Sequence, residues 1–148
     1  MTVLRAIDGY NFNRVIKLKV KPEQEDYVAS NVFSLAQAYA MPECRPWAVY
    51  EGMDPVGFVM YALDADEHEY WIYRLMTDAA HQGKGYGRQA LRLAIEKIRA
   101  EAGKGRDIYI SFEPENAAAR KLYESEGFVP DGRTVDGETV YRLDGVKE

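Results

Sequence analysis

The chain has 148 residues, which is typical of a single domain over residues 1–148, and its 47% hydrophobic and 29% charged composition excludes a disordered or collagen-like chain. Cys44 is the single cysteine, which excludes an intramolecular disulfide and a cysteine-ligated metal cluster. The net charge of −5 argues against nucleic acid as the main partner, because phosphate binding needs an excess of Lys and Arg on one face.

The first half of the chain predicts one strand, two helices and a hairpin. A β-like run covers residues 2–8, and a short helix is expected over 12–19. Pro22 suits the first position of a second helix, which Pro42 ends. Strands are expected over 47–51 and 56–63, joined by a turn that contains Gly and Pro. The buried stripe of the second helix would be Val28, Val32, Leu35, Ala36 and Tyr39.

The second half of the chain alternates strands and helices. A strand over 69–77 leads into a glycine-rich loop over 81–87 and then an amphipathic helix that Gly103 ends. A strand over 107–112 precedes a helix capped by Asn116. Short strands over 128–130 and 139–143 close the chain, with Asp136-Gly137 as a hairpin turn. The order β-α-α-β-β-β-α-β-α-β-β predicts an α/β fold (α+β mixed sheet) with helices on both faces.

The glycine-rich loop is the most informative segment. Gly83, Gly85 and Gly87 alternate after a strand and before a helix, where backbone N–H groups can converge on an anion. Lys84 and Arg88 add positive charge at the same place, so we interpret the loop as a phosphate site rather than a plain turn. A magnesium-binding P-loop is disfavoured, because no hydroxyl residue follows the lysine.

A dinucleotide fingerprint is formally present as Gly85-x-Gly87-x-x-Ala90. That pattern normally has an acidic residue at the end of the next strand, whereas Asp107 lies before it. Too little chain follows for a full nucleotide-binding fold. We therefore rank this interpretation below the following one.

Two motifs resemble those of the GCN5-related N-acetyltransferase (GNAT) family. Gln82-x-x-Gly85-x-Gly87 resembles the family's acetyl-CoA signature, and the run from Asn116 through Leu122-Tyr123 to Gly127-Phe128 resembles its downstream motif. The resemblance implies a GNAT-like acyl-CoA N-acyltransferase fold and acetyl-CoA as co-substrate. It also implies a site for the cofactor. The residues implied in binding it are Leu75, Met76 and Thr77 along the pantetheine arm, Gln82, Gly83, Lys84, Gly85, Tyr86, Gly87 and Arg88 around the pyrophosphate, and Asn116.

Chemical roles follow from the same resemblance. The backbone N–H of Met76 would stabilise the tetrahedral oxyanion, and Tyr123 would face the CoA sulfur as proton donor. An alkyl ammonium must lose a proton before it attacks, and a carboxylate or a chain of waters can accept it. The candidate carboxylates are Glu113, which we place first because it ends the strand beside the cleft, then Glu51 and Glu25, with Tyr73 as a relay. No metal is expected.

The acceptor side is acidic. Four carboxylates lie in the loop over 64–69, and three more lie at 23–26. The segments over 22–31 with 34–36, 56–61 and 71–74 resemble the bacterial spermine/spermidine acetyltransferase branch of the family, although Tyr73 stands where that branch often has an acid. This resemblance implies a polyamine acceptor. The residues expected to bind it are Glu25, Tyr27, Glu51 and Tyr73.

Two other functions stay open. The acceptor could be a protein N-terminus, an aminoglycoside or an amino acid, or the chain could be a non-catalytic CoA-binding module. No run approaches the ~20 apolar residues of a membrane span, and no signal peptide is evident at the N-terminus. We therefore expect a cytoplasmic protein with a small-molecule amine as partner and no membrane or nucleic-acid partner, and a homodimer stays open.

Overall fold

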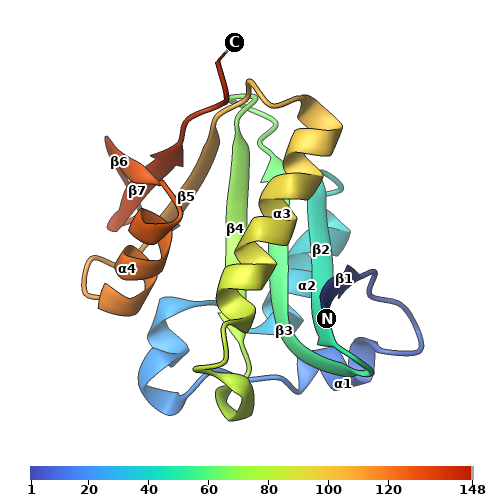
Figure 1. Cartoon of the computed structure of the whole chain (residues 1–148). Coiled ribbons are helices and arrows are strands. Elements are labelled where there is room, and N and C mark those ends of the chain that lie inside the picture. Colours follow the sequence, from blue (N-terminus) through green and yellow to red (C-terminus); the bar gives the residue numbers. More distant parts are fainter. Residues whose placement is uncertain (148) are drawn as a thin grey trace.

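The computed structural model describes residues 1–147, which form one mixed sheet covered by helices on both faces (Figure 1). The sheet order is β1-β2-β3-β4-β5-β7-β6, and only β4 and β5 pair in parallel. The strands are β1 (Thr2–Arg5), β2 (Cys44–Glu51), β3 (Asp54–Leu63), β4 (Tyr70–Thr77), β5 (Ile108–Phe112), β6 (Val129–Val135) and β7 (Glu138–Leu143). The helices are α1 (Phe12–Ile16), α2 (Asn31–Ala40), α3 (Tyr86–Ala102) and α4 (Ala117–Ser125), with 3₁₀ helices η1 (Pro22–Tyr27) and η2 (Ala79–His81).

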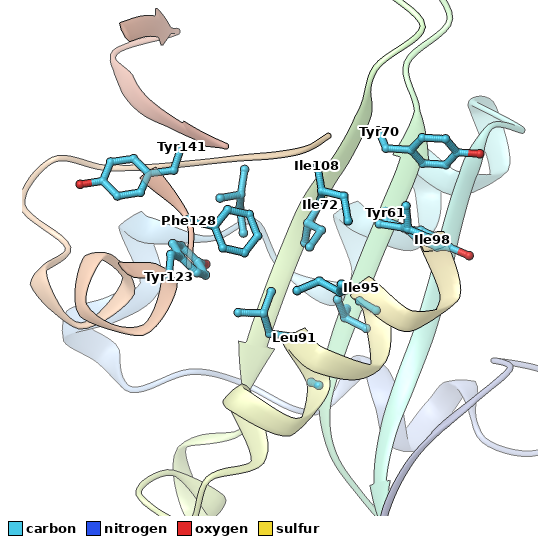
Figure 2. Packing of buried hydrophobic residues seen from close by; sticks show 14 of the residues in the cluster. Tyr61, Tyr70, Ile72, Leu91, Ile95, Ile98, Ile108, Tyr123, Phe128 and Tyr141 are labelled. Atoms are coloured by element: carbon cyan, nitrogen blue, oxygen red, sulfur yellow. The ribbon is translucent and has the colours of Figure 1, made fainter. Parts of the chain in front are cut away.

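Each face of the sheet has its own apolar core. On one face, α1 and α2 pack over a cluster that includes Val15, Phe58 and Met60. On the other face, α3 directs Leu91, Ile95 and Ile98 at the sheet, while Tyr123 and Phe128 pack near α4 (Figure 2). Burying each such aliphatic side chain stabilises the fold by roughly 1.5–3 kcal/mol. The predicted helices on both faces, and the predicted element order, are confirmed.

β4 bends and separates from β5 halfway along its length. Tyr73 is an extra residue opposite β3, because Arg74 pairs with Met60 while Ile72 pairs with Tyr61. β4 pairs with β5 only from Tyr70 to Ile72. From Tyr73 onward the β5 side of β4 has no strand partner, so the two strands open into a cleft.

The second predicted helix is wrong in its extent, and its predicted buried stripe is only partly confirmed, by Val28 and Leu35, which pack against the core. The 3₁₀ helix η1 ends at Tyr27, Val28 is extended, and α2 starts afresh with Ser30 as its N-cap. Val32 and Tyr39 point to solvent, with exposed fractions of 55% and 92%. The inward face carries the buried polar residues Asn31 and Ser34 instead, and the Asn31 side chain donates a hydrogen bond to the carbonyl of Val15.

Several strand and helix ends also differ from the predicted ones. β1 ends at Arg5 and α1 at Ile16, so the first two elements are shorter than predicted. β2 begins at Cys44, although it contains Pro46. Pro46 pairs with Met60 of β3, and β1 does not extend far enough to pair with it on the other side. The missing N–H of a proline is tolerated there, because no second strand needs it. Within residues 1–147, no helix is both long and apolar enough to cross a membrane.

Candidate active site

The opening between β4 and β5 holds a cavity of about 340 Å³, here called the cleft cavity. It is lined by β4 from Ile72 to Thr77, by β5 from Ile110 to Phe112, by the glycine loop and by α4. Among the described residues, none that line it carries a carboxylate. A negatively charged ligand therefore meets no acidic side chain in this lining.

The glycine loop forms one end of the cleft cavity. Gly83 and Gly85 have φ values of +81° and +87°, in the left-handed region that favours glycine. Gly85 is the N-cap residue of α3, and no side chain there accepts a hydrogen bond from the helix backbone. The first N–H groups of this 17-residue helix therefore have no partner within the helix. Such N–H groups and the positive end of the helix dipole are suited to a phosphate.

Side chains from three segments hold the loop in place. The Gln82 side chain donates to the Thr77 carbonyl (3.0 Å) and to the Gln24 side chain of η1 (2.9 Å). Asp78 accepts hydrogen bonds from the backbone N–H groups of Lys19 (2.9 Å) and Ala80 (3.3 Å). Gln82 lines the cleft cavity, so besides its predicted cofactor contact it joins β4 to η1.

The two basic residues of the loop motif lie outside the lining of the cleft cavity. Lys84 is exposed. Arg88 donates to Ser125 (2.7 Å) and to Glu126 (2.5 Å), which also binds Arg92 (2.6 Å). The hydrogen bond from Arg92, together with that from Arg88, holds the pKa of Glu126 below its usual value. This network joins the start of α3 to the end of α4, a role that the sequence did not indicate.

Leu75, Met76 and Thr77 of β4, which the family resemblance places along the pantetheine arm, all line the cleft cavity. Close packing on its β3 side fixes this strand. A Cβ atom on Gly57 would lie 2.5 Å from the Met76 carbonyl oxygen, so only glycine allows the approach. Asn116 and Tyr86 also line the cavity, and the Asn116 side chain caps α4 by accepting from the N–H of Ala119 (3.2 Å).

Tyr123 lies on α4 and lines the same cavity. Its ring packs against Phe112 and Phe128, with centroid distances of 5.5 and 5.9 Å. Burial, and next the negative charge of Glu138, raises the pKa of the Tyr123 hydroxyl above its usual value. The hydroxyl therefore keeps its proton at neutral pH and is available as a donor.

A second, larger cavity of about 760 Å³ adjoins the first and is here called the acidic cavity. Its lining includes two arginines, Arg74 and Arg133. The carboxylates are spread around it, and no group of three or more metal-ligating side chains arranged to hold a metal was found within residues 1–147. The eight acidic residues of the lining are Glu25, Asp26, Asp64, Asp66, Glu67, Glu69, Asp136 and Glu138.

The two cavities meet at the bend of β4. Burial, and next the charge of Asp64, raises the pKa of Tyr73 to about 12, so its hydroxyl is also protonated at neutral pH. Arg74 donates to the Tyr73 carbonyl and to Gln37 (both 2.9 Å), while its buried Nε has no partner within the described chain. The residues that line both cavities are Tyr27, Val28, Ile72, Tyr73, Arg74 and Ser111.

The structure brings some predicted acceptor residues together and leaves others apart. Glu25, Tyr27 and Tyr73 line the acidic cavity. Glu51 lines neither cavity, and its carboxylate binds the N-terminal ammonium (2.7 Å) at the far end of β2. Glu113 follows β5 but also lines neither cavity, so its role as proton acceptor stays a prediction without support from this geometry.

Sequence reasoning missed Arg74, Ser111 and Glu138. Arg74 lies in the strand before the glycine loop, and Ser111 alternates with the apolar residues of β5. The sequence alone therefore marks both as polar residues on a sheet face. Glu138 follows the predicted hairpin turn directly. Its place beside β5 depends on the pairing of β7 with β5, which no local pattern indicates.

Comparisons with known proteins agree with this geometry. The sequence profile of the acetyltransferase (GNAT) family matches residues 12–128. A spermine/spermidine N(1)-acetyltransferase from Bacillus subtilis is 31% identical over 144 residues, covering 93% of this chain and 94% of that protein.

Two solved structures share the fold. An aminoglycoside acetyltransferase in complex with coenzyme A superposes with a TM-score of 0.77 at 19% sequence identity. The match covers 98% of this chain and 95% of the aminoglycoside acetyltransferase chain. Spermidine N-acetyltransferase from Vibrio cholerae, in complex with CoA and spermine, superposes with a TM-score of 0.72 at 21% sequence identity. The match covers 95% of this chain and 92% of the Vibrio cholerae chain. The chain therefore belongs to the acetyltransferase (GNAT) family and is an acetyl-CoA-dependent N-acetyltransferase, as its two motifs predict.

Proposed function

We propose that the protein transfers the acetyl group of acetyl-CoA directly to a primary amine of a polyamine such as spermidine or spermine. The observation that carries the proposal is the contrast between two adjoining cavities. Within residues 1–147, the lining of the cleft cavity holds no carboxylate, whereas that of the acidic cavity holds eight carboxylates and two arginines. An anionic cofactor and a polycationic acceptor would each find a complementary surface.

On this proposal, the cofactor lies along β4. The N–H groups of the glycine loop and of the start of α3 would hold its pyrophosphate. The pantetheine amides would pair with the free edge of β4 at Leu75–Thr77, as an added strand does. The N–H of Met76 would stabilise the oxyanion, and Tyr123 would protonate the leaving sulfur.

The acceptor would enter through the acidic cavity. Glu25 and Asp26 of η1 face it from one segment, and the acidic loop at 64–69 faces it from another. Several carboxylates around one cavity repel one another unless cations neutralise them, which favours a ligand with more than one ammonium group. The Bacillus subtilis relative carries the name of a polyamine acetyltransferase, in line with this proposal.

An acceptor panel tests the proposal by following release of free CoA thiol. We expect spermidine and spermine to give the highest kcat/KM, above a peptide without charged side chains, an amino acid and an aminoglycoside. The value for spermidine should fall severalfold or more between about 50 mM and 500 mM salt, because salt screens the attraction between charges. No thiol release with any polyamine, or a clear preference for the peptide, would contradict the proposal.

Paired variants sharpen the panel. Asp66→Asn removes a charge that lines the acidic cavity, and we expect it to raise the KM for spermidine with little change in kcat. Glu23→Gln is the matched control, since Glu23 is exposed and lines neither cavity. Equal KM values in the two variants would argue against acceptor binding in the acidic cavity.

A further inference from the structure

Glu138 is a carboxylate of the acidic cavity that is hydrogen-bonded to Ser111, a residue of the junction of the two cavities. It is the first residue of β7 and is half-buried. The Ser111 hydroxyl donates a hydrogen bond to its Oε1 atom (2.7 Å), and Ser111 lines both cavities. In the sheet, Ser111 lies opposite Val140, so the side chains of Ser111 and Glu138 project from the same face.

The other carboxylates of the acidic cavity are exposed or already engaged. Five of them, Glu25, Asp26, Asp66, Glu67 and Asp136, are exposed to solvent. Asp64 accepts from the N–H of Glu67 (2.7 Å) within its own loop. Glu69 pairs with Arg133 (3.1 Å) and accepts from the Trp71 indole (3.3 Å). Glu138 has no ion pair within residues 1–147, so its charge remains available to a cation.

The charge of Glu138 also acts on the far side of the junction. It contributes to the raised pKa of Tyr123, a residue that lines the cleft cavity, and it acts on the guanidinium of Arg74. The carboxylate is thus within electrostatic reach of the expected proton donor. Tyr123 of α4 lies on the cleft side of Glu138. The other titratable and charged groups that line the acidic cavity with Glu138 are Tyr73 and Arg74 of β4, Asp136 of its own hairpin, and Glu25, Asp26, Tyr27, Asp64, Asp66, Glu67, Glu69 and Arg133.

We propose that Glu138 binds the reacting ammonium of the acceptor and removes its proton, with Ser111 as the residue that positions the carboxylate. This inference rests on the proposed function and names its proton acceptor. Only about one amine in a few thousand is neutral at pH 7, so a nearby base raises the fraction able to react.

A proton passes from the ammonium nitrogen to a Glu138 oxygen, and the freed lone pair forms a C–N bond to the acetyl carbon. Collapse of the tetrahedral intermediate breaks the C–S bond. Tyr123 gives its proton to sulfur and is reprotonated by the second nitrogen-bound proton. Glu138 returns its proton to water, so that one proton is released with free CoA and the acetylated amine.

The test is the pH dependence of kcat with saturating spermidine for wild type and Glu138→Gln. We expect the variant to lose about tenfold to hundredfold at pH 7. The loss of kcat should become smaller as the pH approaches the pKa of the free amine, about 10, because a larger share of the acceptor is then already neutral in solution. Glu138→Asp should recover part of the loss, and Ser111→Ala should show a smaller loss with the same trend. Glu23→Gln is the control.

Folding and function are separated by two further readouts. Acetyl-CoA binding measured by calorimetry should be unchanged in Glu138→Gln. If that variant does not fold, the pH profiles of Glu138→Asp and Ser111→Ala test the proposal in its place. Wild-type kcat and an unchanged pH profile in the variants would overturn the role of Glu138 and leave the proposed function standing. A wild-type protein that acetylates no polyamine would overturn both.

Discussion

Phenylalanine at position 123 is expected to lower kcat for acetyl transfer by about a hundredfold or more, with unchanged affinity for acetyl-CoA. The substitution removes only the hydroxyl, and the ring keeps its packing against Phe112 and Phe128. The leaving thiolate then departs without a positioned proton donor. Steady-state kinetics with thiol detection measure kcat, and calorimetry measures cofactor affinity.

The pH dependence of this loss has a defined sign. Burial, and next the charge of Glu138, raises the pKa of Tyr123 above its usual value near ~10, so the hydroxyl stays protonated from pH 7 to 9. We therefore expect the ratio of wild-type to variant kcat to stay constant over that range.

Tyr141→Phe is the matched control for the Tyr123 variant. It removes a hydroxyl that binds Glu124 (2.6 Å) and Arg120 (2.9 Å), from a ring that packs on the same Phe112. Tyr141 lines neither cavity, so we expect a loss of stability of about 1 kcal/mol and no change in kcat. Equal kcat values for wild type and Tyr123→Phe would contradict the proton-donor role.

Valine at position 85 is expected to abolish measurable binding of acetyl-CoA. Gly85 has a φ of +87°, which a β-branched residue adopts only with strain of about 1–3 kcal/mol. Its Cβ would project into open space at the start of α3, where the pyrophosphate is expected. Strain and steric blockage therefore act together on the N–H groups that would hold the phosphates. Calorimetry with acetyl-CoA measures the effect.

Gly103→Val separates strain from blockage. Gly103 is the C-cap of the same helix, with a φ of +93° and open space around its Cβ position, and it does not line the cleft cavity. We expect a similar loss of stability without loss of cofactor affinity. If Gly85→Val binds acetyl-CoA as tightly as Gly103→Val, the phosphate site lies elsewhere.

The parts of the site that local patterns determine could be predicted from the sequence. The strand before the glycine loop, the loop and the capped helix at Asn116 are each contiguous segments with recognisable turn and cap residues. All three segments contribute residues to the lining of the cleft cavity, although Lys84 and Arg88 of the loop lie outside it. The element order followed from the same signals.

The acceptor side could be predicted only in part, because it is assembled from distant segments. Glu25 and the acidic loop were visible as local clusters of charge. Glu138 reaches the junction only because β7 pairs with β5. The break between η1 and α2 was missed because helical spacing of apolar residues continued through it, although Val32 and Tyr39 prove to be exposed. Tertiary contacts of Asn31 and Ser34 override that spacing.

The most direct measurement is a crystal structure of the protein with CoA and spermidine bound together. We expect the diphosphate on the N–H groups of residues 83–88, the pantetheine arm along the open edge of β4, and the polyamine in the acidic cavity with one nitrogen near Glu138. A diphosphate bound away from the glycine loop, or a polyamine bound outside the acidic cavity, would contradict this expectation.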